Sequence, residues 1–557
     1  MKNKKLGIIF VLGLWFALAF LLRIYRIGHL GLYADETNGN YWMSYIILKP
    51  ITNIQLLWQK AIFSTFTPSW LIGYSPLSAR LYSVIFSSLI TIAIFFFSIK
   101  VIKFSRSLAV ALTSAFLVAI LPWNFMIARI GHTQIPIIIL LSLIHVGLFL
   151  NAKSLKQYTI SLIPLCISLF YYQSMIIVAG SAGLLTAIYI YLGVDKKIRS
   201  KSLIIFATLF SAVFLVVNQQ YNFLSVASRG MDLAIWRDVN TTWETDKFRG
   251  LSWNSSPSLF SFNLQPEQLA NKLFFNKVVS NLSIFTKNYL SFFTPDWLFM
   301  KGDPILRHST GMVGAFYPFL LPFMIYGAFK FFSTAEKKAR VTFLVWILVS
   351  PIPAAITKDG AGYLLRVITM LPFLTYFCAL GIVESFNLVK KNWRIPYGII
   401  LSLLAIYSAY YFFYGYFHVY PYLSERSFEN GFEKLSDFQV KENNSPMLVL
   451  WDGYYHNGDF RFWQKTPFDQ YENFKLKQLV YGETTVWQTF PNLYFTNPKS
   501  VLDIQKFLKD NPVRYIVLPD RYFLKYPEDI KIILSVNPIE EIQYPDKTTA
   551  LSIYTIK

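Results

Sequence analysis

The chain has 557 residues, of which 54% are hydrophobic and only 15% are charged. Soluble domains carry about a quarter charged residues, so this composition excludes an ordinary water-soluble protein. The net charge of +21 would suit a nucleic-acid partner. However, the basic residues gather in short connections between apolar stretches, which argues against nucleic acid and for a membrane.

Apolar stretches with few or no charges occupy most of the chain up to residue 424. Each reaches the roughly 17–25 residues that a helix needs to cross a membrane. They cover residues 6–22, 81–99, 107–128, 133–152, 157–194, 202–228, 309–335, 341–357, 367–383 and 395–424. The stretch 157–194 is long enough for two spans, with a break near 173–183. We therefore predict an α-helical polytopic membrane protein with about eleven transmembrane helices.

Lysine and arginine concentrate on one side of these spans. If the spans alternate in direction, the N-terminus and the connections on its side hold 18 Lys and Arg but only three acids. Those connections are 100–106, 153–156, 195–201, 336–340 and 384–394. Because basic connections face the cytoplasm, we predict a cytoplasmic N-terminus. An odd number of spans then places the C-terminus outside the plasma membrane.

The long polar pieces fall on the predicted outer side. We expect a transmembrane catalytic domain over residues 1–424, with outer loops 28–79 and 229–308, and a soluble extracytoplasmic domain over 425–557. This tail contains strand-like runs and one stretch with apolar residues at helical spacing. The runs are 447–451, 515–518 and 551–556, and the helical stretch is 500–510. The tail is therefore predicted to be a small α/β domain.

Two adjacent carboxylates, Asp35 and Glu36, are the sharpest candidate for chemistry. They follow the first span, in a loop with few other acids. One interpretation is structural, because acids in a first turn stabilise the N-terminus of a helix, and 37–48 has the character of a helix. The other is catalytic, because a carboxylate at the boundary between water and lipid suits a general base.

Arginines recur at the predicted outer ends of spans. Arg23 and Arg26 end the first span, and each either anchors the helix at the membrane boundary or meets an anionic lipid head group. Arg80 and Arg129 lie at similar positions. The N–H donors of an arginine guanidinium have a fixed geometry that matches phosphate oxygens. Several arginines on one face would therefore suit a phosphate leaving group.

Two outer turns carry further polar candidates. One contains Asp303, Arg307 and His308 beside Gly302 and Pro304, and either binds phosphate or a metal or is a solvated turn. The second, over 357–366, contains Lys358 and Arg366 with two glycines that allow close backbone approach to a ligand. Among sequence motifs, no P-loop, GxGxxG, zinc pattern or serine nucleophile elbow occurs.

These pieces together resemble a known family. The run RIYRIGHLGLYADE over 23–36 is similar to the first-loop signature of the GT-C membrane glycosyltransferases, closest to the protein O-mannosyltransferases and the transferase that adds aminoarabinose to lipid A. Supporting similarities follow in order over residues 5–420. They are Ala79-Arg80-Leu81, Leu121-Pro-Trp with Arg129, Tyr171-Tyr-Gln-Ser174, Gly302-Asp303 with Arg307-His308, and Pro351-Ile-Pro-Ala-Ala-Ile-Thr with Arg366.

The resemblance implies an inverting glycosyltransferase that uses a polyprenyl-phosphate sugar donor at the outer membrane face. Asp35 matches the acid that the family uses as base, and Glu36 its neighbour. The implied partners are the lipid-linked donor, membrane lipids, and a lipid, glycan or protein acceptor. After Glu36 the chain reads Thr-Asn-Gly where these relatives tend to continue with Ala, so acceptor contacts stay open. Some family members bind a divalent metal and some do not, so no metal ligand is assigned.

A transporter or flippase of lipid-linked saccharides is the alternative function. Transporters usually have paired halves and ionisable groups near the membrane midplane. Here the ionisable residues cluster at the ends of spans, with His145 as the exception, and no matching halves are visible. The enzyme reading is therefore favoured.

Overall fold

A computed structural model describes residues 2–557, apart from 102–106, most of 194–231, 256–272, 429–430, 452–455, most of 468–475, and 521–527. The chain forms two compact units. The first contains residues 1–23, 83–128 and 134–413, and the second contains 24–82, 129–133 and 414–557. The first loop after the first span therefore groups with the C-terminal tail, whereas the sequence had placed it with the spans.

Helices of membrane-spanning length confirm the polytopic prediction. Among the described residues, seven segments are long and apolar enough to cross a membrane, or up to eight if one bent pair is a single span. The seven are Leu6–Ile24 in α1 (Lys2–Ile24), α5 (Pro76–Val101), α8 (Gln134–Asn151), Met175–Leu192 in α10 (Met175–Gly193), Lys337–Ala355, Leu364–Leu388 and Lys391–His418. The bent pair is α6 (Ser107–Ile120) and α7 (Pro122–Ala128).

Three of the seven segments are built from more than one helix. Lys337–Ala355 contains α17 (Lys337–Val349) and α18 (Ile352–Ala355). Leu364–Leu388 contains α19 (Leu364–Val367), the 3-10 helix η4 (Ile368–Met370) and α20 (Leu371–Leu388). Lys391–His418 contains the 3-10 helix η5 (Lys391–Trp393) and α21 (Arg394–His418).

Two other predicted spans form shorter helices, and one lies outside the described residues. The helix α9 (Leu155–Ser168) and the helix α16 (Leu321–Thr334) each have 14 residues. The 3-10 helix η3 (Pro318–Leu320) leads directly into α16. The helical conformation does not extend to the N-terminal side of Pro318. Gly311 has a positive φ of 71°, and Pro318 restricts the backbone of the residue before it. The predicted span 202–228 falls outside the described residues.

The helices α16 and α20 pack closely because each has a glycine at the contact. A Cβ on Gly327 of α16 would overlap the carbonyl oxygen of Phe377, and a Cβ on Gly381 of α20 would overlap that of Phe323. Small residues let the backbones of membrane helices approach, and the gain in van der Waals contact stabilises the pair. The segment that contains α20 is 89% buried, so it is a central helix of its unit.

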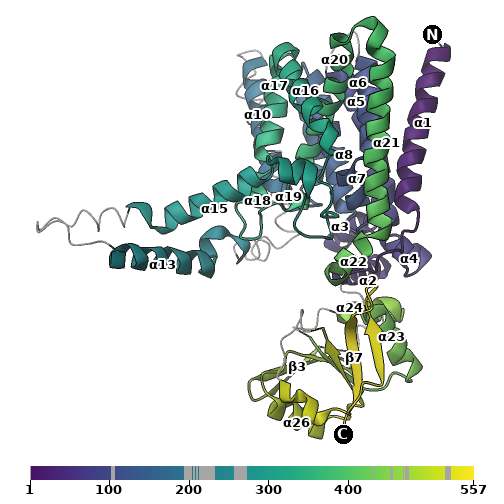
Figure 1. The fold of residues 1–557 in the computed structure, drawn as a ribbon, viewed down its shortest axis with the longest axis vertical. Helices are drawn as coiled ribbons and strands as arrows, with labels where there is room; N and C mark the ends of the chain where they lie inside the picture. The colour runs from purple at the N-terminus through teal and green to yellow at the C-terminus, as the bar shows by residue number, and fades with distance from the viewer. Residues whose placement is uncertain are drawn as a thin grey trace, which may run out of the picture. The chain divides into compact units, whose positions relative to one another are not determined.

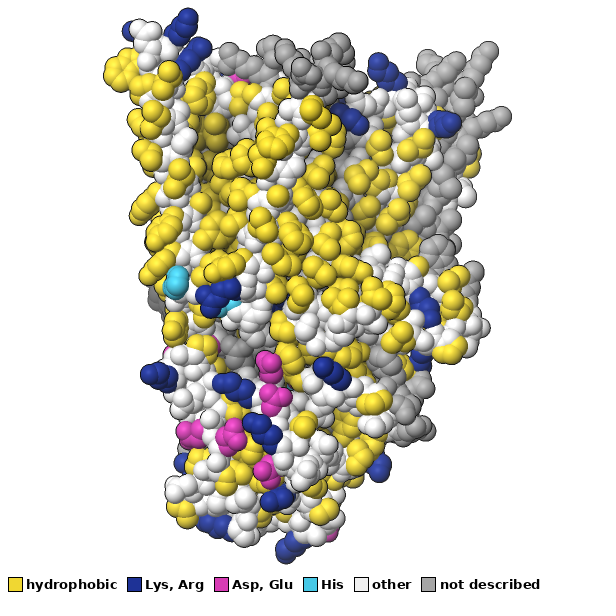
Figure 2. Space-filling model, turned by 90° about the vertical axis from the view of Figure 1, so that its right-hand side faces the viewer, with side chains coloured by type: hydrophobic (Ala, Val, Ile, Leu, Met, Phe, Trp, Pro, Cys, Tyr) yellow, Lys and Arg dark blue, Asp and Glu magenta, His cyan; other side chains and the backbone are white. Residues whose placement is uncertain are grey.

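Other spans present apolar side chains outward, as helices in lipid do. In the α1 segment only 17% of the residues are buried, and in the α21 segment only 6%. Ile399, Leu403 and Ile406 are among the exposed residues of α21. Figure 2 shows the right-hand side of Figure 1, where hydrophobic side chains cover most of the helical part and few charged groups appear.

Arg23, at the end of α1, is buried within its unit. Its Nη1 donates to the carbonyl oxygen of Ala119 at 2.9 Å, and its Nη2 to that of Val118 at 3.1 Å. These are carbonyls of the last turn of α6, which lack partners within their own helix. The chain bends there by 51° into α7. Arg23 thus caps a broken helix, a role that neither sequence interpretation included.

The second unit contains a seven-stranded mixed sheet and several helices. The strands are β1 (Met447–Leu450), β2 (Lys477–Tyr481), β3 (Thr484–Phe490), β4 (Leu493–Thr496), β5 (Tyr515–Pro519), β6 (Glu540–Gln543) and β7 (Thr549–Thr555). Their order is β2-β3-β4-β1-β5-β7-β6, and β1 runs parallel to both β4 and β5. The remaining helices of the tail are α22 (Tyr420–Ser424), η6 (Glu425–Phe428), α23 (Phe432–Lys441), α24 (Asn457–Trp463), α26 (Val501–Asp510) and η7 (Glu528–Ile533).

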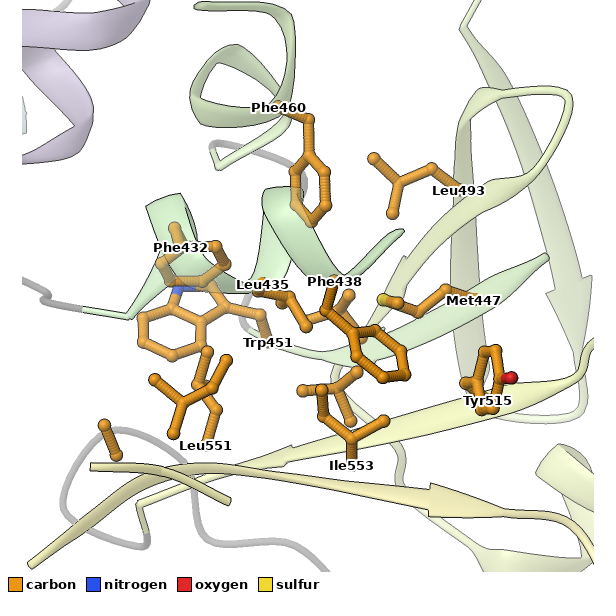
Figure 3. Packing of buried hydrophobic residues seen from close by; sticks show 14 of the residues in the cluster. Phe432, Leu435, Phe438, Met447, Trp451, Phe460, Leu493, Tyr515, Leu551 and Ile553 are labelled. Carbon is orange, nitrogen blue, oxygen red and sulfur yellow. The ribbon is translucent and has the colours of Figure 1, made fainter. Parts of the chain in front are cut away.

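The sheet has a hydrophobic core on each face. Alternate residues of β1 point to opposite faces, and all four are buried. Met447 and Val449 join the core under α23 and α24, whereas Leu448 and Leu450 join the core under α26. Figure 3 shows the first core, in which Phe432, Leu435 and Phe460 pack over the sheet. The predicted α/β tail, with its strands and its helix near 500–510, is confirmed.

Candidate functional site

The first loop contains three helices, and the first of them presents the predicted carboxylates. They are α2 (Ala34–Leu48), α3 (Ile54–Phe63) and α4 (Ser69–Ile72). Asp35 and Glu36 lie in the first turn of α2, where negative charge is favourable. Asp35 is exposed and Glu36 is 2% exposed. The two carboxylates are adjacent in sequence, but only Asp35 is accessible to solvent.

Glu36 forms a buried ion pair with Arg80. Its Oε1 accepts from Arg80 Nε at 2.7 Å, and its Oε2 accepts from Arg80 Nη2 at 2.8 Å. Both side chains are 0% exposed. Glu36 also accepts from the Gly131 N–H at 2.7 Å and from the Tyr33 N–H at 3.2 Å. The latter bond closes the N-terminus of α2, as the acid of a capping box does.

Arg80 uses its remaining donors on the backbone of the first loop. Nη1 donates to the carbonyl oxygens of Ile27 at 3.0 Å and Leu30 at 3.1 Å, and Nη2 donates to that of Gly31 at 2.7 Å. Together with the two bonds to Glu36, this occupies the five N–H donors of a guanidinium. Arg80 therefore joins the turn at 27–31 to the start of α2.

Arg129 also donates hydrogen bonds to the backbone of the first loop. Its Nη1 donates to the Tyr25 carbonyl at 2.7 Å and its Nη2 to the Arg26 carbonyl at 2.6 Å. Its Nε donates to the hydroxyl of Tyr416 at 2.8 Å. Arg26 has a positive φ of 48°, which turns the chain out of α1. Arg129 therefore contacts the backbone of the first loop, where the sequence had suggested a phosphate.

The close packing at position 131 favours glycine. A Cβ there would lie 3.0 Å from the Ala79 carbonyl oxygen and 3.2 Å from Glu36 Oε1. The next residue, His132, forms a short hydrogen bond through Nε2 with the Tyr33 hydroxyl. The turn 129–133 is thus an integral part of the α2 site, although the sequence marked only Arg129 in it.

The C-terminal tail also contacts α2. The Thr37 hydroxyl donates to Asp459 Oδ1 at 2.7 Å, and His456 Nδ1 lies 2.8 Å from Asp459 Oδ2. Asp459 and His456 are both 2% exposed. The Tyr41 hydroxyl donates to the Thr466 carbonyl at 2.8 Å. No sequence pattern marked Asp459 or His456, because more than 400 residues separate them from Thr37.

A second group of predicted residues lies in the first unit. Asp303 and His308 are both 3% exposed, and His308 Nδ1 lies 2.8 Å from Asp303 Oδ2. The same Asp303 oxygen accepts from the Leu364 N–H at 2.7 Å, and Oδ1 accepts from the Ile305 N–H at 2.7 Å. Asp303 and His308 line a small hollow with Trp123 and Trp297. Arg307 is partly buried beside them in sequence.

Arg366 pairs with Asp359 at the start of α19. Nη1 and Nη2 donate to the two carboxylate oxygens at 2.8 and 3.2 Å, and the guanidinium lies over the Tyr363 ring at 4.3 Å. Burial raises the pKa of Asp359, but the hydrogen bonds and charge of Arg366 outweigh burial and lower the pKa overall. Lys358 has an exposed side chain, and its backbone N–H donates to the Leu233 carbonyl at 2.8 Å.

The residues described do not provide a protein-built metal site. Among them, no three His, Cys, Asp or Glu side chains lie close enough to hold one ion. The carboxylates that are buried already accept hydrogen bonds from arginine, histidine or backbone N–H groups.

Comparisons with known proteins find likeness in structure only. No protein-family model and no curated protein matches the chain in sequence. The chain is similar to the Archaeoglobus fulgidus oligosaccharyltransferase tethered with an acceptor peptide containing the NVT sequon. The TM-score is 0.50 at 12% identity, covering 100% of this chain and 74% of that one.

Two further structures of the same archaeal protein have TM-scores of 0.48. One is in complex with an inhibitory peptide and a dolichol-phosphate, with 12% identity over 92% of this chain and 69% of that one. The other is in complex with Zn and sulfate, with 12% identity over 97% and 73%.

The Glu36–Arg80 pair predicts a measurable loss of stability. Arg80→Lys leaves only three donors for Glu36 and three carbonyl groups, so buried acceptors lose their partners. Breaking a buried pair costs about 3–5 kcal/mol, and we expect a clearly lower unfolding temperature in detergent by intrinsic fluorescence. The control is Arg249→Lys, because Arg249 is 43% exposed. An Arg80→Lys protein that unfolds with the parent would contradict this structural role.

The likeness over the full chain gives the fold alone at this identity. It confirms the predicted fold class: a polytopic helical part with helices long enough to span a membrane, followed by a C-terminal α/β domain.

Proposed function

We propose that this chain is a membrane glycosyltransferase that moves a saccharide from a polyprenyl-phosphate donor to an acceptor. The observation that carries the proposal is the first turn of α2, where Asp35 is exposed while Glu36 is buried against Arg80. The missing nucleotide motifs support a lipid-linked donor, because such a donor needs no soluble nucleotide site. The fold shared with an oligosaccharyltransferase supports transfer of a saccharide, and the acceptor peptide in that structure supports a protein acceptor.

Asp35 is proposed as the general base of an inverting transfer. An acceptor hydroxyl attacks the anomeric carbon, the bond from that carbon to the phosphate oxygen breaks, and the hydroxyl proton passes to Asp35. The electron pair of the broken bond leaves with the lipid phosphate. A single displacement of this kind inverts the anomeric carbon. Glu36 cannot share this role in the structure described, because its oxygens accept bonds from Arg80, Gly131 and Tyr33.

Replacement of Asp35 by Asn tests this assignment. The amide keeps the shape of the side chain and removes its proton affinity, so transfer should fall by about 10²–10⁴-fold, with donor binding little changed. The measurement is turnover of purified protein with a polyprenyl-phosphate saccharide extracted from host membranes. Asp437→Asn is the matched control, because Asp437 is an exposed carboxylate of the same unit. Near-parental turnover of Asp35→Asn would rule Asp35 out as the base.

The four predicted phosphate-binding arginines separate into two groups. Arg80 and Arg129 donate to protein groups of the first loop, which supports a structural role. Arg366 pairs with Asp359, a carboxylate that is 46% exposed. An incoming phosphate can therefore replace Asp359 as the partner of the Arg366 guanidinium. We retain Arg366 and Arg307 as the proposed contacts for the leaving phosphate, whose growing negative charge they would stabilise.

Arg366→Lys should weaken donor binding without unfolding the protein. A lysine cannot reproduce the two-point contact of the guanidinium, and one charged hydrogen bond is worth about 1.5–3 kcal/mol. We therefore expect donor affinity, measured by titration of the purified protein, to fall roughly 10–100-fold. Arg340→Lys serves as the control, because its Nη1 contact to the Phe332 carbonyl is exposed. Equal donor affinity in the two variants would remove the support for a phosphate contact at Arg366.

The proposed topology places this chemistry outside the cytoplasm, at the plasma membrane. The basic residues of the predicted inner connections support it. A protease added to intact cells should then remove the C-terminal domain from about residue 425. Protection of that domain until the cells are lysed would overturn the orientation.

A further inference from the structure

Two helices, of which the second is amphipathic, lie in the second loop of the first unit. The helices are α13 (Val239–Ser255) and α15 (Lys277–Ser291). The Thr245 and Ser280 hydroxyls are joined by a hydrogen bond of 2.7 Å, so Ser280 marks the side of α15 that faces α13. In Figure 1 both helices run across the direction of the spans of their unit, such as α16, α17 and α20.

The side of α15 opposite to Ser280 is apolar. With 100° per residue, positions 278, 282, 285 and 289 fall within one stripe on the far side of the helix from position 280. Val278, Leu282, Phe285 and Tyr289 occupy that stripe. Val278 is 75% exposed and Leu282 is 62% exposed. The side toward α13 is mixed: Lys277, Lys287 and Asn288 lie near Ser280, together with Ile284.

This apolar stripe adjoins the outward side of a span. The Tyr289 hydroxyl donates to the Leu348 carbonyl of α17 at 2.8 Å. Leu344 and Leu348 are 46% and 42% exposed, within a segment of membrane-spanning length. Two residues beyond the end of the same segment, the Thr357 carbonyl accepts from Asn288 Nδ2 at 2.9 Å. The apolar face of α15 therefore continues the apolar face that α17 presents to lipid.

We propose that α15 lies in the membrane interface with its Val278–Leu282 side in the lipid and α13 on its water side. Exposed apolar side chains in such numbers have no stable place in water. A helix across the spans, with one apolar face and lysines on the polar face, is typical of helices that lie in the plane of a bilayer. The proposal depends on the membrane fold alone, and it holds whether or not Asp35 is the catalytic base.

Spin labelling of the full chain tests the proposal. Single cysteines replace Leu282 on the apolar side and Lys287 on the polar side, with Cys166 changed to alanine and the buried Cys378 retained. The labelled proteins are placed in nanodiscs of phosphatidylcholine and phosphatidylglycerol. Collision with oxygen, which concentrates in lipid, is compared with collision with a water-soluble nickel complex.

We expect the ratio of oxygen to nickel collision at Leu282→Cys to match that of Leu344→Cys on α17. It should be at least about threefold above that of Lys287→Cys, because only the apolar side meets lipid. Val278→Cys repeats the test if Leu282→Cys does not fold. Equal access of nickel to positions 282 and 287 would overturn the proposal. Exclusion of both probes from 282 would also overturn it, because protein, such as a second copy of the chain, would then cover this face.

Discussion

The buried pair of Glu36 and Arg80 is the constraint on which the first-loop site depends. Two charges removed from water are stable only if every donor and acceptor finds a partner. Here the carboxylate accepts four hydrogen bonds, and the guanidinium donates three more to backbone carbonyls. Because these partners come from three separate segments, 27–36, 80 and 131, satisfying one ion pair determines the position of all three.

A consequence of this pair is the position of Asp35. The first turn of α2 cannot rotate without withdrawing Glu36 from Arg80 and Gly131, so the neighbouring side chain keeps a fixed direction. The hydrogen bond from Thr37 to Asp459 holds the same helix from the C-terminal domain. An exposed carboxylate on a helix held at two adjacent residues is well suited to a base that must meet its substrate in one geometry.

Properties that depend on local composition were predictable from the sequence. Length and hydropathy predicted most of the spans, and helical and strand periodicity predicted β1, β5, β7 and α26. Pairing across the chain was not predictable. The sequence marked Glu36 and Arg80 separately, as a candidate catalytic acid and a phosphate ligand, because nothing local indicates that they meet across 44 residues. For the same reason the contact between Thr37 and Asp459 carried no signal, whereas Asp303 and His308, five residues apart, were grouped correctly as neighbours.

Rescue by a small carboxylate most directly tests the division of roles between the two adjacent acids. Asp35→Ala leaves space at an exposed position, whereas Glu36→Ala leaves a cavity beside buried Arg80. If Asp35 is the base and Glu36 holds the loop, formate should restore saccharide transfer to Asp35→Ala without changing its unfolding temperature, and Glu36→Ala should unfold at a lower temperature than the parent. Rescue of Glu36→Ala without rescue of Asp35→Ala would contradict the account.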